Sequence, residues 1–171
     1  MSVIGDIAHG EVTADPHPLE ALYHREYQSL VRLASILIDD RASCEEIVQD
    51  AFVRTLVAWD RLRDSAKGPQ FLRSAVLNGA RSQLRRRAVV RRHPQAAPQP
   101  YASMESASVD HHILVRELRR LPGRQRDCVV LRYYLDLAER DIAATLGISP
   151  GSVKTHLHRG LAALAEHLED R

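Results

Sequence analysis

The stretch that decides the fold runs from Leu137 to Leu168 and reads LAERDIAATLGISPGSVKTHLHRGLAALAEHL. Apolar residues recur in it every three or four positions, which predicts two helices. Gly147 marks the turn between them, and Ser149-Pro150 supplies a capping side chain and a proline suited to the first helical position. Two helices joined by a tight turn are typical of a helix-turn-helix, which lays its second helix in the DNA major groove.

The second of these helices has an apolar side and a polar side. The predicted apolar stripe consists of Val153, Leu157, Leu161, Leu164 and Leu168. Hydroxyl and cationic side chains on the other side suit base edges and phosphates. The residues predicted to face DNA are Ser152, Lys154, Thr155, His156, His158 and Arg159. A solvated helix of an ordinary bundle would also be amphipathic, and a helix-turn-helix alone does not separate a repressor, an activator and a polymerase subunit.

A purely basic segment lies in the first half of the chain. Pro69 to Arg92 holds seven arginines and no acidic residue. Gly68-Pro69 predicts a helix start, and we expect the helix to end at the cluster Arg85-Arg86-Arg87, with Arg91 and Arg92 just beyond. Cations at a helix C-terminus favour the helix dipole, but this explains only part of the cluster. Clustered arginines also neutralise phosphates, which indicates nucleic acid binding.

The preceding segment is acidic, because residues 20–60 carry eight acidic residues against four arginines. Ser43 to Glu46 fits a capping box and predicts a helix that begins just after Ser43. The predicted core side of this helix consists of Ile47, Val48, Ala51, Phe52, Leu56 and Trp59. Its outer side consists of Glu45, Glu46, Gln49, Asp50 and Arg54. This uneven charge predicts different partners for different faces of the molecule.

The rest of the chain completes an all-α organisation. Helical spacing also covers residues 22–38, 113–121 and 124–134, residues 60–68 form a polar loop, and no segment has a convincing strand pattern. Residues 93–110 are rich in Pro, Ala, Ser and Gln, which predicts a flexible linker. We therefore expect a flexible N-terminus (1–17) and two small helical domains (18–92 and 111–171) joined by that linker.

Several classes of protein are disfavoured by composition. Cys44 and Cys128 are far apart and form no CxxC, so we expect idle thiols in a reducing compartment. Neither a signal-peptide pattern nor an apolar run of about 20 residues occurs, which predicts a soluble cytoplasmic protein without a membrane partner. The histidine pairs do not share a helix face, so we expect no metal and no cofactor. The absence of a catalytic triad, a paired carboxylate or a phosphate loop predicts that the protein is not an enzyme.

Four motifs, in order, resemble the extracytoplasmic-function (group 4) class of RNA polymerase sigma factors. They are Glu45 to Arg54 (EEIVQDAFVR); Asn78 with Leu84-Arg85-Arg86-Arg87; Leu121-Pro122 with Arg126 to Tyr134; and Gly147-Ile148-Ser149 with Gly151 to Lys154 and Leu157-His158-Arg159. The resemblance runs from about Leu19 to Leu168 and implies a sigma-2 domain followed by a sigma-4 domain. It implies a factor that binds core RNA polymerase, recognises the −10 and −35 promoter elements and promotes DNA melting.

The resemblance also implies roles for single residues. Glu45, Glu46, Gln49, Asp50 and Arg54 match the surface that docks on the clamp coiled coil of the largest polymerase subunit, and the sigma-4 domain would meet the flap of the second-largest subunit. The loop 60–68 and Asn78 would capture a flipped base of the −10 element. The residues assigned to −10 DNA are Arg61, Arg63, Lys67, Asn78, Arg81, Arg85, Arg86 and Arg87. The last helix would read the −35 element, and an anti-sigma factor is a further partner.

The chain departs from the family pattern at a few positions. Ala138 stands where a capping Ser is frequent, His156 and Leu161 where Arg is common, and Ser82 where Asp is frequent. Two other readings stay open on the residues alone. One is a conventional DNA-binding regulator whose N-terminal block dimerises or senses a signal. The other is a helical adaptor that binds only protein, although an arginine cluster would have no use there.

Overall fold

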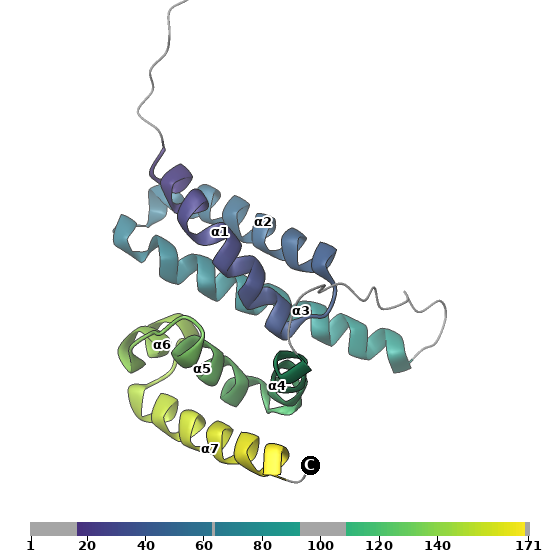
Figure 1. The fold of residues 1–171 in the computed structure, drawn as a ribbon. Coiled ribbons are helices and arrows are strands. Elements are labelled where there is room, and N and C mark those ends of the chain that lie inside the picture. Colours follow the sequence, from purple (N-terminus) through teal and green to yellow (C-terminus); the bar gives the residue numbers. More distant parts are fainter. Residues whose placement is uncertain (1–16, 63, 93–108, 170–171) are drawn as a thin grey trace, which may run out of the picture.

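The computed structural model describes residues 17–62, 64–92 and 109–169 (Figure 1). Over these ranges the chain forms seven α-helices, two 3₁₀ turns and no strand, which confirms the all-α prediction. The elements are α1 (Pro18–Leu37), α2 (Arg41–Ala58), η1 (Trp59–Arg61), η2 (Ser65–Lys67), α3 (Gly68–Arg92), α4 (Val109–Arg120), α5 (Gly123–Tyr133), α6 (Glu139–Leu146) and α7 (Pro150–Glu169). The predicted linker lies outside the described residues except at its end, because α4 begins at Val109.

Helices α1, α2 and α3 pack against one another and form the N-terminal domain (Figure 1). Their apolar faces meet in a core that excludes water and includes Leu30, Leu33, Val48, Leu72 and Val76. Tyr23, Tyr27 and Phe52 stack at one side of this core, with 4.9 Å between the ring centroids of Tyr23 and Phe52. This bundle fixes α2 and α3 so that each also presents a long outer side.

The predicted capping box at Ser43 is wrong. Helix α2 begins at Arg41, and the carboxylate of Asp40 is the N-cap, which accepts a hydrogen bond from the Ser43 N–H at 3.2 Å. The Ser43 hydroxyl donates to the same carboxylate and lowers the pKa of Asp40. Asp is as good a cap as Ser, and a cap at Asp40 places Ser43 inside the first turn.

The predicted core side of α2 is wrong at one position. Leu56 is 52% exposed, and the neighbouring Thr55 is fully buried instead. Thr55 tolerates burial because its hydroxyl donates to the carbonyl of Ala51, one turn earlier, at 2.7 Å. The apolar Leu56 is thereby left on the outer side of the helix.

Helix α3 is longer than predicted. It continues to Arg92, so Arg85, Arg86 and Arg87 lie inside the helix rather than at its end. Because no proline or glycine follows before residue 93, nothing in the sequence stops the helix at the cluster. The three arginines therefore point in different directions around the axis.

Helices α6 and α7 form the predicted helix-turn-helix within a C-terminal domain of four helices, α4 to α7. Gly147 ends α6 in the left-handed region, at φ 65°, which glycine adopts without strain. The Ser149 hydroxyl accepts a hydrogen bond from the Ser152 N–H at 3.1 Å, as expected for the cap of α7. Ala138 precedes α6 and gives it no side-chain cap.

The predicted apolar stripe of α7 is correct at three of its five positions. Val153, Leu157 and Leu164 are buried, but Leu161 and Leu168 are 40% and 44% exposed. The buried line passes through Gly160 instead, where an added Cβ would lie 2.9 Å from Cγ2 of Val129 in α5. Because Gly160 has no side chain, α7 packs closely against α5 at this position. The next residue, Leu161, faces outward.

The two domains pack against each other, which nothing in the sequence analysis predicted. Helix α6 contacts α3, and α4 contacts α1, while α7 lies on the side of the C-terminal domain away from α1 and α3 (Figure 1). We call this contact the domain interface. No helix in the described ranges is long and apolar enough to cross a membrane.

Candidate nucleic-acid and polymerase interfaces

Helix α7 holds the polar face predicted to meet DNA. Lys154, Thr155, His158 and Arg159 are exposed, and Ser152 and His156 are half-buried. The Thr155 hydroxyl donates to the Gly151 carbonyl at 3.1 Å, and Lys154 Nζ lies 3.8 Å from a carboxylate oxygen of Glu139. The Ser149 cap and the buried Val153 fix the first turn, so the polar side chains leave a rigid helix into solvent.

The cationic residues assigned to −10 DNA fall into distinct settings. Arg85 and Arg86 are exposed on α3, and Arg85 donates to the Ser82 hydroxyl at 3.0 Å. Arg87 is half-buried and forms ion pairs with Asp39 at 2.8 Å and Asp40 at 3.4 Å. Arg87 therefore ties α3 to the start of α2, whereas Arg85 and Arg86 are exposed to solvent.

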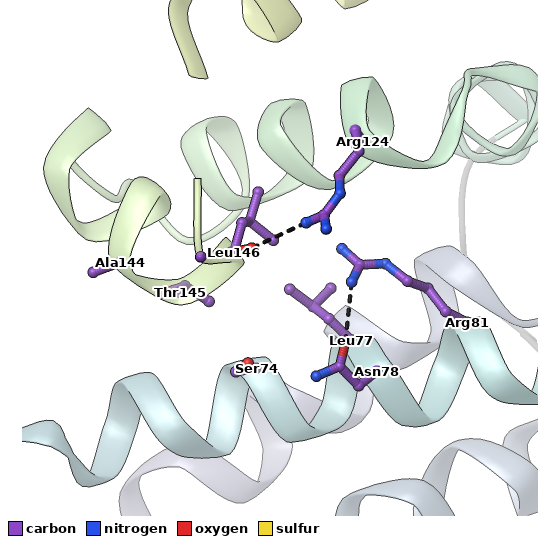
Figure 2. A pocket seen from close by; sticks show the side chains of 9 residues that line it. Ser74, Leu77, Asn78, Arg81, Arg124, Ala144, Thr145 and Leu146 are labelled. Carbon is purple, nitrogen blue, oxygen red and sulfur yellow. Dashed lines mark hydrogen bonds between the residues drawn. The ribbon is translucent and has the colours of Figure 1, made fainter. Parts of the chain in front are cut away.

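Arg81 lies one turn and Asn78 two turns before Arg85, on the side of α3 that faces the C-terminal domain (Figure 2). Arg81 donates to the Asn78 side-chain carbonyl at 3.0 Å and forms an ion pair with Asp127 of α5. Asn78 is exposed and Arg81 is half-buried. Arg61 and Lys67 are exposed on the two 3₁₀ turns before α3, and Arg63 lies outside the described residues.

The predicted polymerase-binding residues lie together on the outer side of α2. Glu46, Gln49, Asp50 and Arg54 are exposed and Glu45 is half-buried. Arg54 pairs with Asp50 at 2.7 Å and Arg41 with Glu45 at 2.8 Å, each one turn apart along the helix. Such exposed pairs contribute little stability, so most of this polar surface is not needed by the fold.

Three apolar residues on the same helix are exposed, although the sequence analysis placed none of them on the outer side. Val53, Leu56 and Val57 are 58%, 52% and 73% exposed. The signal that could have found them is that α2 has more apolar residues than one core-facing stripe can use. With the five polar residues above they make up what we call the outer face of α2.

The described residues contain no group of three His, Cys, Asp or Glu side chains placed to hold a metal ion. Cys44 and Cys128 are both free and buried. The surfaces that the molecule offers are therefore a helix-turn-helix, an arginine-bearing helix and an acidic-apolar helix, on two packed helical domains. Together with the helix-turn-helix, they are typical of a DNA-binding protein.

Comparison with known proteins specifies the class. Family models described as sigma-70 region 2 and sigma-70 region 4 match residues 22–89 and 111–164. An RNA polymerase sigma-E factor of Streptomyces avermitilis is 33% identical over 168 residues, which cover 96% of this chain and 90% of the relative. The ECF RNA polymerase sigma factor SigM of Mycobacterium tuberculosis is 30% identical over 161 residues, covering 92% and 80%.

Solved structures with the same fold include the sigma factor RpoE from Bartonella quintana, crystallised with the anti-sigma factor NepR. It superposes with a TM-score of 0.74 at 22% identity over 89% of this chain and 98% of that one. CnrH, in complex with the cytosolic domain of CnrY, superposes with a TM-score of 0.71 at 22% identity, covering 89% and 88%.

The chain belongs to the extracytoplasmic-function sigma factors of the sigma-70 family. It is a factor that binds core RNA polymerase and promoter DNA and directs promoter-specific initiation of transcription. Members of this family are initiation factors rather than enzymes.

Proposed function

We propose that three surfaces divide the work of this sigma factor. The outer face of α2 docks on the clamp coiled coil of the largest polymerase subunit, α3 with the two 3₁₀ turns binds the −10 element, and α7 reads the −35 element. The observation that carries the proposal is the outer face of α2. It combines exposed valines and a leucine with acidic residues, on a helix whose other side packs into the core.

The outer face of α2 has the composition of a protein interface. Val57 is 73% exposed, and contiguous apolar surface of this kind marks interaction sites. Glu46 and Asp50 flank the apolar residues and suit a basic partner, because complementary charge speeds association and selects among partners. A helical coiled coil would bury the apolar residues and leave the carboxylates at the rim.

Helix α3 supports −10 recognition through Asn78 and the exposed Arg85 and Arg86. Arginines bind the phosphates of separated strands, and an Asn side chain offers a donor and an acceptor to a base edge. Taking a base out of the stack costs a few kcal/mol, which these contacts and the 3₁₀ turns would offset. The exposed Arg61 and Lys67 add phosphate contacts near the same helix start.

Helix α7 supports −35 recognition because its polar first turns are exposed and stiffened by the Ser149 cap. In this proposal Arg159 binds a guanine edge and Lys154 binds a phosphate. The flap of the second-largest polymerase subunit would meet the same domain. The protein would act in the cytoplasm, with core polymerase, without metal or cofactor and with no reaction of its own.

The structural relatives suggest a further partner. RpoE and CnrH were each solved with a second protein, which for RpoE is an anti-sigma factor. We include an anti-sigma factor among the proposed partners of this chain.

The test is a charge reversal on α2. Asp50→Lys should weaken binding to core polymerase at least tenfold in a competition with wild-type protein, and Val57→Ala should weaken it severalfold. Glu20→Lys on α1 is the matched control, because Glu20 is an exposed acid in the same domain that lies outside the outer face of α2. Wild-type affinity in Asp50→Lys and Val57→Ala, with unchanged circular dichroism, would assign the docking surface elsewhere.

A further inference from the structure

Three arginines lie around a single buried carboxylate where α3 meets α5. Asp127 of α5 is fully buried and forms an ion pair with Arg81 of α3, whose Nε lies 2.9 Å from the carboxylate. Nε of Arg126 lies 4.0 Å from the other oxygen of Asp127 and has no hydrogen-bond partner in the described part of the chain. Arg124 lies one turn before Asp127, and no carboxylate of the described residues is within ion-pair distance of it. Three cations are therefore balanced only in part by one carboxylate.

The excess of positive charge acts on the arginines themselves. Burial lowers the pKa of Arg126, and the charges of Arg81 and Arg119 lower it further, while the Asp127 carboxylate opposes them. Taking a charge out of water is costly unless an opposite charge matches it. A further negative charge beside these arginines would therefore stabilise the cluster.

A cavity of about 210 Å³ lies beside the cluster, between α3, α5 and the end of α6 (Figure 2). The guanidinium groups of Arg81 and Arg124 point toward one another from its opposite walls (Figure 2). No Asp or Glu of the described residues lines the cavity, and the buried Leu77 and Leu146 form part of its lining. Like charges repel, and an apolar lining strengthens charge interactions because it lowers the local dielectric constant. An anion between the two arginines would replace repulsion by attraction.

The polar groups of this cavity are hydrogen-bond donors that are only partly used. Arg124 donates one N–H to the Leu146 carbonyl at 3.1 Å. Arg81 donates to the Asn78 side-chain carbonyl at 3.0 Å. Each guanidinium has five N–H groups and so keeps further donors. Within the described ranges, the Asn78 amide N–H₂ and the Ser74 hydroxyl make no hydrogen bond. Guanidinium, amide and hydroxyl donors around one space suit the oxygens of a phosphate.

The cavity has the size and the access that a small anion needs. Its volume is below the roughly 300–1,000 Å³ of pockets that enclose a whole drug-sized ligand. Asn78 and Arg124 are exposed, so the cavity is open to solvent. A tetrahedral oxyanion can enter it, whereas the rest of a larger molecule would stay outside.

We propose that this cavity binds a phosphate oxyanion, which is either inorganic phosphate or the terminal phosphoryl group of a nucleotide. Arg81 and Arg124 bind its charge, and Asn78 and Ser74 donate to its remaining oxygens. We call these four residues the phosphate pocket.

A bound anion would contact two residues that we assign to −10 DNA, Asn78 and Arg81. Phosphate and promoter therefore compete for them, and this consequence, unlike the site itself, rests on the −10 assignment made above. Abundant phosphate or nucleotide would lower the affinity of the protein for DNA.

The first experiment measures anion binding to the full-length protein by isothermal titration calorimetry in a phosphate-free buffer. The titrants are sodium phosphate, ATP without magnesium and adenosine, and sodium chloride keeps the ionic strength constant. Arg124→Ala and Ser74→Ala each remove one donor of the phosphate pocket and lie outside the proposed DNA and polymerase surfaces. Arg132→Ala is the matched control, because Arg132 lies on the same helix and also donates to a backbone carbonyl, that of Leu137 at 2.9 Å, outside the pocket.

We expect wild type and Arg132→Ala to bind phosphate with the same affinity. Arg124→Ala should bind it about tenfold more weakly and Ser74→Ala severalfold more weakly, because charge-assisted hydrogen bonds are stronger than neutral ones. ATP binding that falls in the same two variants, without binding of adenosine, would identify the terminal phosphoryl group of a nucleotide as a ligand. Phosphate binding without ATP binding would identify free phosphate.

Two results would overturn the site. One is a wild-type protein that gives neither heat of binding nor a higher unfolding temperature with phosphate, since a ligand of the native state stabilises it. The other is phosphate binding that is unchanged in folded Arg124→Ala and Ser74→Ala. Circular dichroism reports folding, and Ser74→Ala decides the matter if Arg124→Ala does not fold, because it removes only a hydroxyl.

The second experiment measures competition with DNA by fluorescence anisotropy of a random single-stranded DNA at constant ionic strength. Saturating phosphate should weaken DNA binding severalfold in wild type and Arg132→Ala and have no effect in Arg124→Ala. Phosphate that binds without weakening DNA binding would support the site and contradict the −10 assignment of Asn78 and Arg81.

Discussion

At the scale of the residue, the arginines of this protein separate into those that hold the fold and those that are exposed to solvent. Arg87 joins α3 to Asp39 and Asp40, and Arg119 joins α4 to α1. Arg85, Arg86 and Arg159 are exposed. A count of basic residues therefore overstates the surface available to DNA.

Alanine substitutions of Arg159 and Lys154 should affect DNA binding in different ways. Arg159→Ala should cost on the order of 1–3 kcal/mol at a −35 element with a guanine under that side chain, and should relax the preference for that base pair. Lys154→Ala should weaken all sequences about equally, because a phosphate contact has no sequence information. Selection of −35 sequences from a randomised pool checks both. An unchanged preference in folded Arg159→Ala would place the reading side of α7 elsewhere.

The two thiols should be inert while the protein is folded. Burial raises the pKa of Cys44 to about 12 and that of Cys128 to about 11, because an apolar environment disfavours the thiolate. The reactive thiolate is therefore scarce at pH 8 in the native state and returns on unfolding. Ellman's reagent should label neither cysteine at pH 8 until denaturant is added. Rapid native labelling of either one would show that its helix opens.

At the scale of the element, α6 lacks a cap that a single substitution can supply. Ala138 is exposed with φ −66° and ψ 152°, the backbone conformation of an N-cap. Ala138→Ser should stabilise the C-terminal domain by about 1 kcal/mol and raise its unfolding temperature by several degrees. Ala162→Ser, at an exposed interior position of α7, is the control and should give no gain. Equal melting temperatures in Ala138→Ser and wild type would mean that water already satisfies these N–H groups.

The elements themselves were predictable from local pattern, and the errors have a common cause. Apolar spacing located every helix, and Gly147 and Ser149 located the turn of the helix-turn-helix. The sides assigned to Leu56 and Leu161 were wrong because neighbouring residues determine which side is buried. In α2, Thr55 is buried because its hydroxyl donates to a carbonyl of the same helix. In α7, Gly160 leaves room for Val129 of α5. Single-helix periodicity does not contain that information.

At the scale of the whole molecule, the sequence predicted two helical domains but not their contact. Arg81 and Asp127 are 46 residues apart and belong to different domains, and each reads as an ordinary charged residue on its own helix. Leu77, which is 1% exposed, lines the cavity between the domains. Only the packed chain reveals that these residues face one another.

The central claim is that this protein directs core RNA polymerase to initiate transcription at particular promoters. The most direct measurement is run-off transcription with purified core polymerase on fragmented genomic DNA of the source bacterium, followed by sequencing of RNA 5′ ends. With the protein we expect discrete start sites that share two upstream sequence boxes. The amount of RNA from these sites should fall at least tenfold with Asp50→Lys and stay unchanged with Glu20→Lys. The same 5′ ends from core polymerase with and without the protein would contradict the account.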